Sequence, residues 1–219
     1  MGFAADGVAG LAPYNRPMTK HYDQAYFERW YRESSKKDHA VGSAARLTRK
    51  VALAVATAEY HLERPIRTVL DIGCGEGAWR APLLKLRPKA SYLGFDSSEY
   101  AVHRYGARRN VHFARFADFA QLRPCPPVDL LVCSDVMHYL ETRELDRGLP
   151  GLAELCGGVA FLETFTGEDE TDGDNVGFHP RPARFYRQRF AKAGFVPLGS
   201  HLWLSPALSD RLVALERPV

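Results

Sequence analysis

Short apolar runs alternate with longer amphipathic stretches over most of the chain. From residue 67 onward, five runs are apolar enough to be strands buried on both faces, and the stretches between them have helical periodicity. The expected strands are 67–72, 91–95, 111–116, 128–134 and 158–165, and the expected helices are a run ending at 86, then 99–107 and 142–155. Such alternation is typical of an α/β domain whose mostly parallel sheet is covered by helices on both sides.

The end of the chain breaks this alternation. Pro182 is well placed in the first turn of a helix over 182–193. Two strands are expected after it, over 195–204 and 212–217, and the link between them is too short for a parallel crossover. We therefore expect these two closing strands to be antiparallel.

Two helices are expected before the first strand, over 19–32 and 44–62. The first carries Tyr22, Tyr26 and Trp30 on one face. Such a face commonly packs in a core, but it is also suited to closing over a cationic ligand and excluding water.

The domain organisation follows from these elements. Residues 1–17 are expected to be a flexible leader, with Met18 as an alternative start. We expect one domain over 18–219, in which 18–64 form a helical lid and 65–219 form the core.

Composition narrows the class of protein. The 219 residues are 46% hydrophobic and 25% charged, which fits one soluble domain with a full core, and no apolar run is long enough to span a membrane. The four cysteines form no C-x-x-C pair, so neither a metal site nor a disulfide scaffold is expected, and a cytoplasmic location is the default. The net charge of +3 is too small to require nucleic acid as a partner.

The clearest chemical motif lies in 69–77, where a strand ends in the glycine-rich turn of sequence GCGEG and a helix follows. The glycines let a ligand lie against bare backbone, and the helix start offers free N–H groups. No G-K-[ST] follows, so this is not a phosphate-binding loop of the Walker type. Asp71 and the G-x-G-x-G spacing are unusual for an NAD-binding fold and suit a ligand with a positive amino group.

Polar residues follow the next three strands. Asp96 and Ser97 end the second strand, where a carboxylate can accept both hydroxyl groups of a ribose. Asp118 and Phe119 follow the third strand, where a carboxylate beside a ring could hold an adenine. Residues 133–139 end the fourth strand, next to the point where ligands bind in such sheets.

Together these four segments, in this order, resemble the motifs of class I S-adenosylmethionine-dependent methyltransferases over about 67–165. The resemblance implies a Rossmann-like, doubly wound, seven-stranded sheet with the last strand antiparallel. It also implies S-adenosylmethionine as the cofactor. The implied contacts are Asp71, Gly73, Cys74 and Gly75 for the methionine end, Asp96 and Ser97 for the ribose, Asp118 and Phe119 for the adenine, and Ser134 and Val136 for the sulfur side.

The activity implied is methyl transfer by in-line displacement to an oxygen or nitrogen atom of a small-molecule acceptor. His138, beside the expected sulfonium, is the candidate general base, ahead of Tyr139, Glu163 and His179, although residues at this point can simply pack against the cofactor.

The acceptor could carry a carboxylate or phosphate. Four arginines that could grip such a group follow the acidic loop 168–174, unless they are only a solvated helix face: Arg181, Arg184, Arg187 and Arg189. The acidic loop does not fit the pattern of a calcium-binding loop and is expected to be solvated.

Two other readings stay open. One is an RNA methyltransferase, which the low net charge and the missing N-P-P-Y element after the fourth strand disfavour. The other is a non-catalytic subunit that binds the cofactor and stabilises a partner, for which a broken glycine turn would be the usual sign. Oligomeric state is left open by the sequence.

Overall fold

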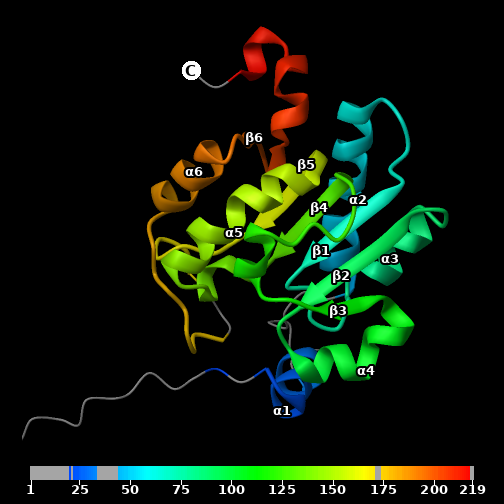
Figure 1. Cartoon of the computed structure of the whole chain (residues 1–219), viewed down its shortest axis with the longest axis vertical. Coiled ribbons are helices and arrows are strands. Elements are labelled where there is room, and N and C mark those ends of the chain that lie inside the picture. Colours follow the sequence, from blue (N-terminus) through cyan, green and yellow to red (C-terminus); the bar gives the residue numbers. More distant parts are fainter. Residues whose placement is uncertain (1–19, 21, 34–43, 171–173, 218–219) are drawn as a thin grey trace, which may run out of the picture.

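The computed structural model describes residues 20, 22–33, 44–170 and 174–217. A seven-stranded sheet runs through the molecule in the order β3-β2-β1-β4-β5-β7-β6 (Figure 1). The pairs formed among β1 to β5 are parallel, whereas β7 is antiparallel to both β5 and β6. The expected mostly parallel sheet with an antiparallel last strand is confirmed.

The strands are β1 (Thr68–Ile72), β2 (Ser91–Asp96), β3 (Val111–Phe113), β4 (Val128–Ser134), β5 (Cys156–Glu163), β6 (Val196–Gly199) and β7 (Leu202–Leu204). The α-helices are α1 (Gln24–Phe27), α2 (Ala44–Leu62), α3 (Arg80–Leu86), α4 (Glu99–Arg109), α5 (Thr142–Leu155) and α6 (Ala183–Lys192).

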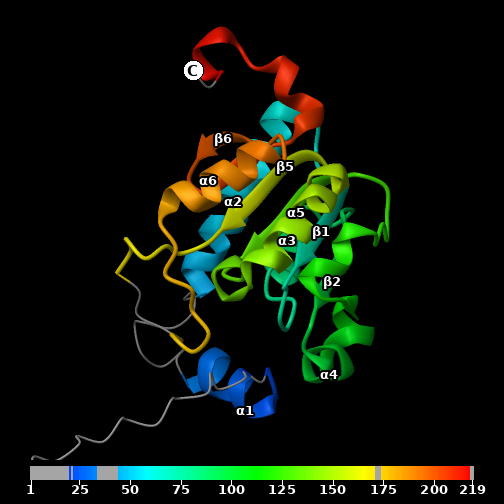
Figure 2. The same cartoon turned by 60° about the vertical axis from the view of Figure 1, so that its left-hand side comes forward.

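Helices cover both faces of the sheet. On one face, α5 and α6 bury apolar side chains such as Leu145 and Phe190 against the strands. On the other face, α2 and α3 do the same with Val51 and Leu83, and the two views place these helices on opposite sides (Figures 1 and 2). This doubly wound arrangement leaves the carboxyl ends of the parallel strands as the place where a ligand can enter.

The N-terminal region differs from the expectation in two ways. The helix expected over 19–32 begins only at Gln24, because the Asp23 side chain accepts the Tyr26 N–H and caps it, and it continues as a π-helix over Glu28–Glu33. Helix α2 packs on the sheet and so belongs to the core, which corrects its assignment to a lid. The expected leader, 1–17, lies outside the described residues.

The C-terminal region contains a further correction. The run expected as one strand over 195–204 is the hairpin of β6 and β7. The prediction of a strand over 212–217 is wrong. Ser200 and His201, with φ of 50° and 65°, reverse the chain inside that run. Short 3-10 turns, Pro206–Arg211 and Ala214–Glu216, follow the hairpin at the end of the molecule opposite α1 (Figure 1).

The third strand is also shorter than expected. It ends at Phe113, and Phe116–Ala120 form a 3-10 helix in which Asp118 accepts the Arg115 N–H. Within the described residues, no helix combines the length and the hydropathy needed to cross a membrane.

Candidate active site

The glycine turn between β1 and α3 adopts a conformation that favours glycine. Gly73, Gly75 and Gly77 have φ of 70°, 54° and 72°, which is the left-handed region. The N–H groups of Gly73 and Cys74 donate to Phe95 O at the end of β2, at 2.8 and 3.1 Å. The turn is therefore fixed to the neighbouring strand.

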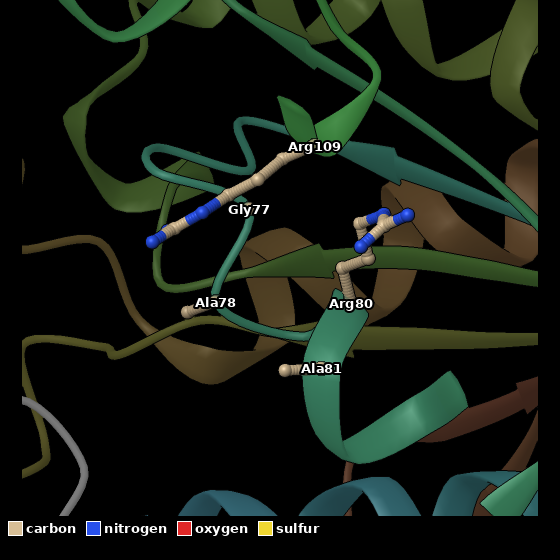
Figure 3. Close-up of a pocket in the computed structure, with 5 residues that line it drawn as sticks. All are labelled: Gly77, Ala78, Arg80, Ala81 and Arg109. Atoms are coloured by element: carbon tan, nitrogen blue, oxygen red, sulfur yellow. The ribbon is translucent and has the colours of Figure 1, made fainter. Parts of the chain in front are cut away.

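The outer side of this turn borders a pocket. Gly77, Ala78, Arg80, Ala81 and Arg109 line it (Figure 3). Arg109 Nη1 donates to the main-chain oxygen of Glu76 at 2.6 Å. This arginine therefore holds the turn in place.

Asp96 is hydrogen-bonded to the turn. Its Oδ2 accepts the Gly75 N–H at 2.7 Å, and its Oδ1 accepts the Ser98 N–H at 2.8 Å. Burial raises the pKa of this carboxyl, and these main-chain N–H groups oppose the rise. The Ser97 N–H is a further donor, and a carboxylate offers about four acceptor positions, so the group can still accept a hydroxyl donor; the Ser97 residue itself is exposed.

Asp71 lies beneath the turn. Its side chain is 1% exposed, and Oδ2 accepts the Tyr92 hydroxyl at 2.6 Å. Burial raises the pKa of Asp71 to about 7. The structure therefore places this carboxylate under the site, next to Asp96, and not on its surface.

Replacing Asp71 with asparagine is expected to remove a pH dependence of stability. The folded state holds a proton on Asp71 up to about pH 7, whereas an unfolded carboxyl releases it near 4, so folding of the wild type weakens as the pH rises between these values. Relative to Asp71→Asn, the wild type should lose up to ~1.4 kcal/mol per pH unit in this window.

Urea unfolding at pH 4.5, 5.5, 6.5 and 7.5 measures the effect, with Asp210→Asn as the control for an exposed carboxylate. If the free energies of unfolding of wild type and Asp71→Asn differ by a constant amount over this range, the raised pKa of Asp71 is contradicted.

The two residues expected to flank an adenine, Asp118 and Phe119, lie in different environments. Asp118 is exposed beside the end of β3, where a ligand could reach it. The ring of Phe119 is 0% exposed and packs edge-on against Phe95 at 5.5 Å in the core. The expectation that the Phe119 ring flanks the ligand is therefore wrong, and only its main chain remains available.

The end of β4 meets the glycine turn. A Cβ added at Gly73 would lie 2.4 Å from Val136 Cγ2, so the Val136 side chain packs directly on the glycine and leaves no room for a side chain there. Asp135 has φ of 64°, an uncommon conformation for a residue other than glycine, and its N–H donates to Glu163 O at 3.0 Å. Burial raises the pKa of Asp135 to about 6.

Glu163, considered above as a weaker candidate base, is paired with a lysine. Its side chain is 1% exposed and contacts Lys50 Nζ of α2 through both oxygens, at 2.5 and 2.7 Å. The Ser134 hydroxyl donates to Oε2 at 2.5 Å. Burial raises the pKa of Glu163, but the Lys50 charge and these hydrogen bonds outweigh burial and lower it overall, so the carboxylate is ionised and fully engaged.

His138 is enclosed by rings. It is 1% exposed, and the rings of Tyr139, Phe165 and Phe178 have centroids at 4.1, 5.6 and 5.4 Å. Its Nδ1 accepts the Phe165 N–H at 3.3 Å, and Nε2 lies 3.4 Å from Asp135 Oδ1. Burial, followed by the nearby Lys20 charge, lowers its pKa to about 4.

The N-terminal segment reaches this site. The Ser98 hydroxyl, at the start of α4, donates to Tyr22 O at 2.5 Å. Lys20 Nζ lies 2.6 Å from Asp174 Oδ2 and 3.2 Å from the centroid of the Tyr139 ring. Sequence patterns missed Lys20, Lys50 and Asp135, since single lysines and a non-glycine residue in a left-handed conformation leave no local signal.

The arginine cluster is divided between two environments. Arg181 donates to Leu140 O at 2.7 Å, and Arg189 pairs with Asp146 at 2.7 Å. Arg184 and Arg187 are exposed. The arginines with these partners therefore hold the α5–α6 region together. His179 is partly exposed, 3.7 Å from Glu141.

Comparison with known proteins agrees with this geometry. Residues 70–158 match a family model described as a methyltransferase domain. This stretch of the chain is thus a methyltransferase domain, and the strand order agrees with the class I S-adenosylmethionine-dependent type.

Two curated relatives are trans-aconitate 2-methyltransferases. That of Azoarcus sp. is 30% identical over 154 residues, covering 68% of this chain and 58% of the relative. That of Methylobacterium nodulans is 39% identical over 85 residues, covering 38% of this chain and 32% of the relative. The aligned part of the chain thus spans less than two thirds of the length of each.

Among solved structures, magnesium protoporphyrin IX methyltransferase from Synechocystis PCC 6803, with S-adenosylhomocysteine bound, has a TM-score of 0.59 at 21% identity. The match covers 84% of this chain and 96% of that one. At this identity the likeness concerns the fold.

Proposed function

We propose that this protein transfers a methyl group from S-adenosylmethionine to a carboxylate oxygen of a small organic acid. The observation that carries the cofactor assignment is the connection between the left-handed glycine turn and Asp96, made by the Gly75 N–H at 2.7 Å. It puts bare backbone and an ionisable carboxylate at the end of adjacent parallel strands, which suits a nucleoside with a zwitterionic tail.

Roles for the individual residues follow from their positions. Gly73, Cys74 and Gly75 would hold the methionine end, with Asp71 beneath them. Asp96 and Ser97 would hold the ribose, Asp118 and the main chain of Phe119 the adenine, and Ser134 and Val136 the sulfur side. The bound cofactor supplies a methyl group on a positively charged sulfur. The described N-terminal residues, 20 and 22–33, would cover the crevice and keep water out.

A carboxylate acceptor is supported by two facts. The curated relatives are named for trans-aconitate, a tricarboxylic acid. A carboxylate is already ionised at neutral pH, so it can attack the methyl carbon without a base, and the task of the protein is to align the two atoms. This agrees with a site whose only central histidine among the described residues is enclosed and bonded to main chain.

His138→Phe is therefore expected to keep kcat within about threefold of wild type, because the ring serves for packing. Loss of a general base would instead cost about 10²–10⁴-fold. Initial rates of S-adenosylhomocysteine release with trans-aconitate at pH 7.5 measure this. A loss of a hundredfold or more in a variant that melts like wild type would restore the base assignment.

The first test of the function is calorimetric titration with S-adenosylhomocysteine. Asp96→Ala should weaken binding by about 100-fold, because a hydrogen bond from the ligand to a charged group is lost and the Gly75 N–H loses its acceptor. The matched control is Asp210→Ala, at an exposed position away from the turn. Binding of NAD in place of S-adenosylhomocysteine would contradict the proposal.

The same assay separates the alternatives. Tight binding of S-adenosylhomocysteine with no turnover of any acid would favour the non-catalytic subunit. Turnover of RNA but not of small acids would favour the RNA methyltransferase. Neither alternative has support among the relatives found.

A further inference from the structure

Lys20 holds a buried positive charge at the site. Its side chain is 10% exposed, and its Nζ lies 2.6 Å from Asp174 Oδ2. The Nζ also faces three rings, with the centroid of Tyr139 at 3.2 Å, Tyr22 at 5.2 Å and Tyr26 at 5.3 Å. Aromatic faces stabilise a cation but accept hydrogen bonds only weakly.

This ammonium group is short of acceptors. It has three N–H donors, and within the described part of the chain Asp174 is its only close anionic contact, with no further hydrogen-bond acceptor at the Nζ. A buried donor left unpaired costs about 1–3 kcal/mol, so a ligand that brings more oxygen atoms to this point would be stabilised.

Asp174 has hydrogen bonds that do not depend on Lys20. Its Oδ1 accepts the Val176 N–H at 3.0 Å, and its main-chain oxygen accepts the Tyr139 hydroxyl at 2.8 Å. Lys20 lies on a different segment, which is attached to α4 through Tyr22. The lysine can therefore change its partner while the Asp174 loop stays in place.

The position of Lys20 is on the acceptor side. Tyr139, over which it lies, follows the end of β4, where Ser134 and Val136 meet the glycine turn. Of the arginines considered for gripping an anion, Arg181 and Arg189 already bind protein groups. Lys20 is thus a cation next to the end of β4 whose ammonium group can still take up an anionic acceptor.

We propose that Lys20 binds a carboxylate of the acceptor, which replaces Asp174 as the partner of its ammonium group. The inference rests on the proposed function and names the residue that selects the acceptor class. When no acceptor is bound, Asp174 would stay paired with the ammonium group. It would therefore compete with anions that bind Lys20 weakly.

The test is calorimetric titration of tricarballylate, an unreactive tricarboxylate, into protein saturated with S-adenosylhomocysteine. Lys20→Met should weaken tricarballylate binding about 30-fold, as expected for loss of a charge-assisted contact. Asp174→Asn should tighten it several-fold, because the competing carboxylate is removed. Lys85→Met, at an exposed position on α3, is the control and should match wild type.

Opposite effects of the two variants distinguish recognition from a structural ion pair. If both variants weaken tricarballylate binding, or if Lys20→Met leaves it unchanged, the inference is overturned. If S-adenosylhomocysteine binds but wild type takes up no tricarballylate at millimolar concentration, the inference also fails while the cofactor assignment stands. If S-adenosylhomocysteine itself does not bind, the proposed function fails, and the inference fails with it.

Discussion

Gly73→Ala should lower the free energy of unfolding by about 2–4 kcal/mol and abolish measurable binding of S-adenosylhomocysteine. The new Cβ would lie 2.4 Å from Val136 Cγ2 and 3.0 Å from Cγ1, distances at which atoms repel strongly. The residue would also have to keep φ near 70°, a conformation that disfavours alanine. Relief requires the glycine turn to move away from β4, and this movement displaces the N–H groups that bind the ligand.

The matched control is Gly199→Ala. Gly199 also has a positive φ, 89°, but a Cβ there would have nothing within 4 Å. Gly199→Ala should therefore lower the free energy of unfolding only by the cost of an alanine at positive φ, about 1–2 kcal/mol. Cofactor binding should be unchanged. Urea unfolding and calorimetry on both variants separate the cost of the backbone conformation from the cost of the contact with Val136. Equal losses of stability in the two variants, with binding intact in both, would show that the close approach to Val136 does not matter.

The second large effect is expected for Lys50→Met. Removing this lysine leaves Glu163, which is 1% exposed, as a buried carboxylate without its cation, and breaking a buried pair in this way costs about 3–5 kcal/mol. Since Glu163 also bonds Ser134 at the end of β4, the loss should reach the candidate site and lower kcat/KM. The destabilisation should be smaller at pH 5 than at pH 8, because an unpaired Glu163 takes up a proton more readily.

The double variant Lys50→Met with Glu163→Gln should recover most of the lost stability, since no buried charge remains. Lys85→Met, on an exposed face of α3, should change stability by no more than about 0.5 kcal/mol. A Lys50→Met protein as stable as wild type at pH 8, or a double variant no better than the single one, would mean that the pair is not what keeps Glu163 ionised.

Local patterns were sufficient for most of the sheet and for the positions of the glycine turn and Asp96. The strands β1, β2, β4 and β5 are nearly continuous apolar runs, and a run of that kind is buried whatever its neighbours are. The glycine turn and Asp96 each follow directly from the end of a strand, so their placement at one edge of a parallel sheet requires only the strand assignment.

The errors arose where short-range signals were ambiguous. The hairpin of β6 and β7 was expected as one strand because the chain reverses at Ser200 and His201. Serine and histidine are not the residue types that usually indicate a left-handed turn, which are Gly, Asn and Asp. The Phe119 ring was expected to face a ligand, but the core beside Phe95 offered a larger gain from burial. Helix α2 was assigned to a lid because its contacts with the sheet are all distant in sequence.

The arrangement of charges at the site depended on folding. Lys50 and Glu163 are 113 positions apart, and Lys20 is still further from Asp174, so no window along the chain contains either pair. Whether His138 is a base or a packed ring depends on the Phe165 N–H and on burial, which lowers its pKa to about 4. Apolar periodicity is a local property and can be detected in the sequence alone. Desolvation and ion pairing depend instead on which groups the long-range contacts bring within a few ångströms of one another.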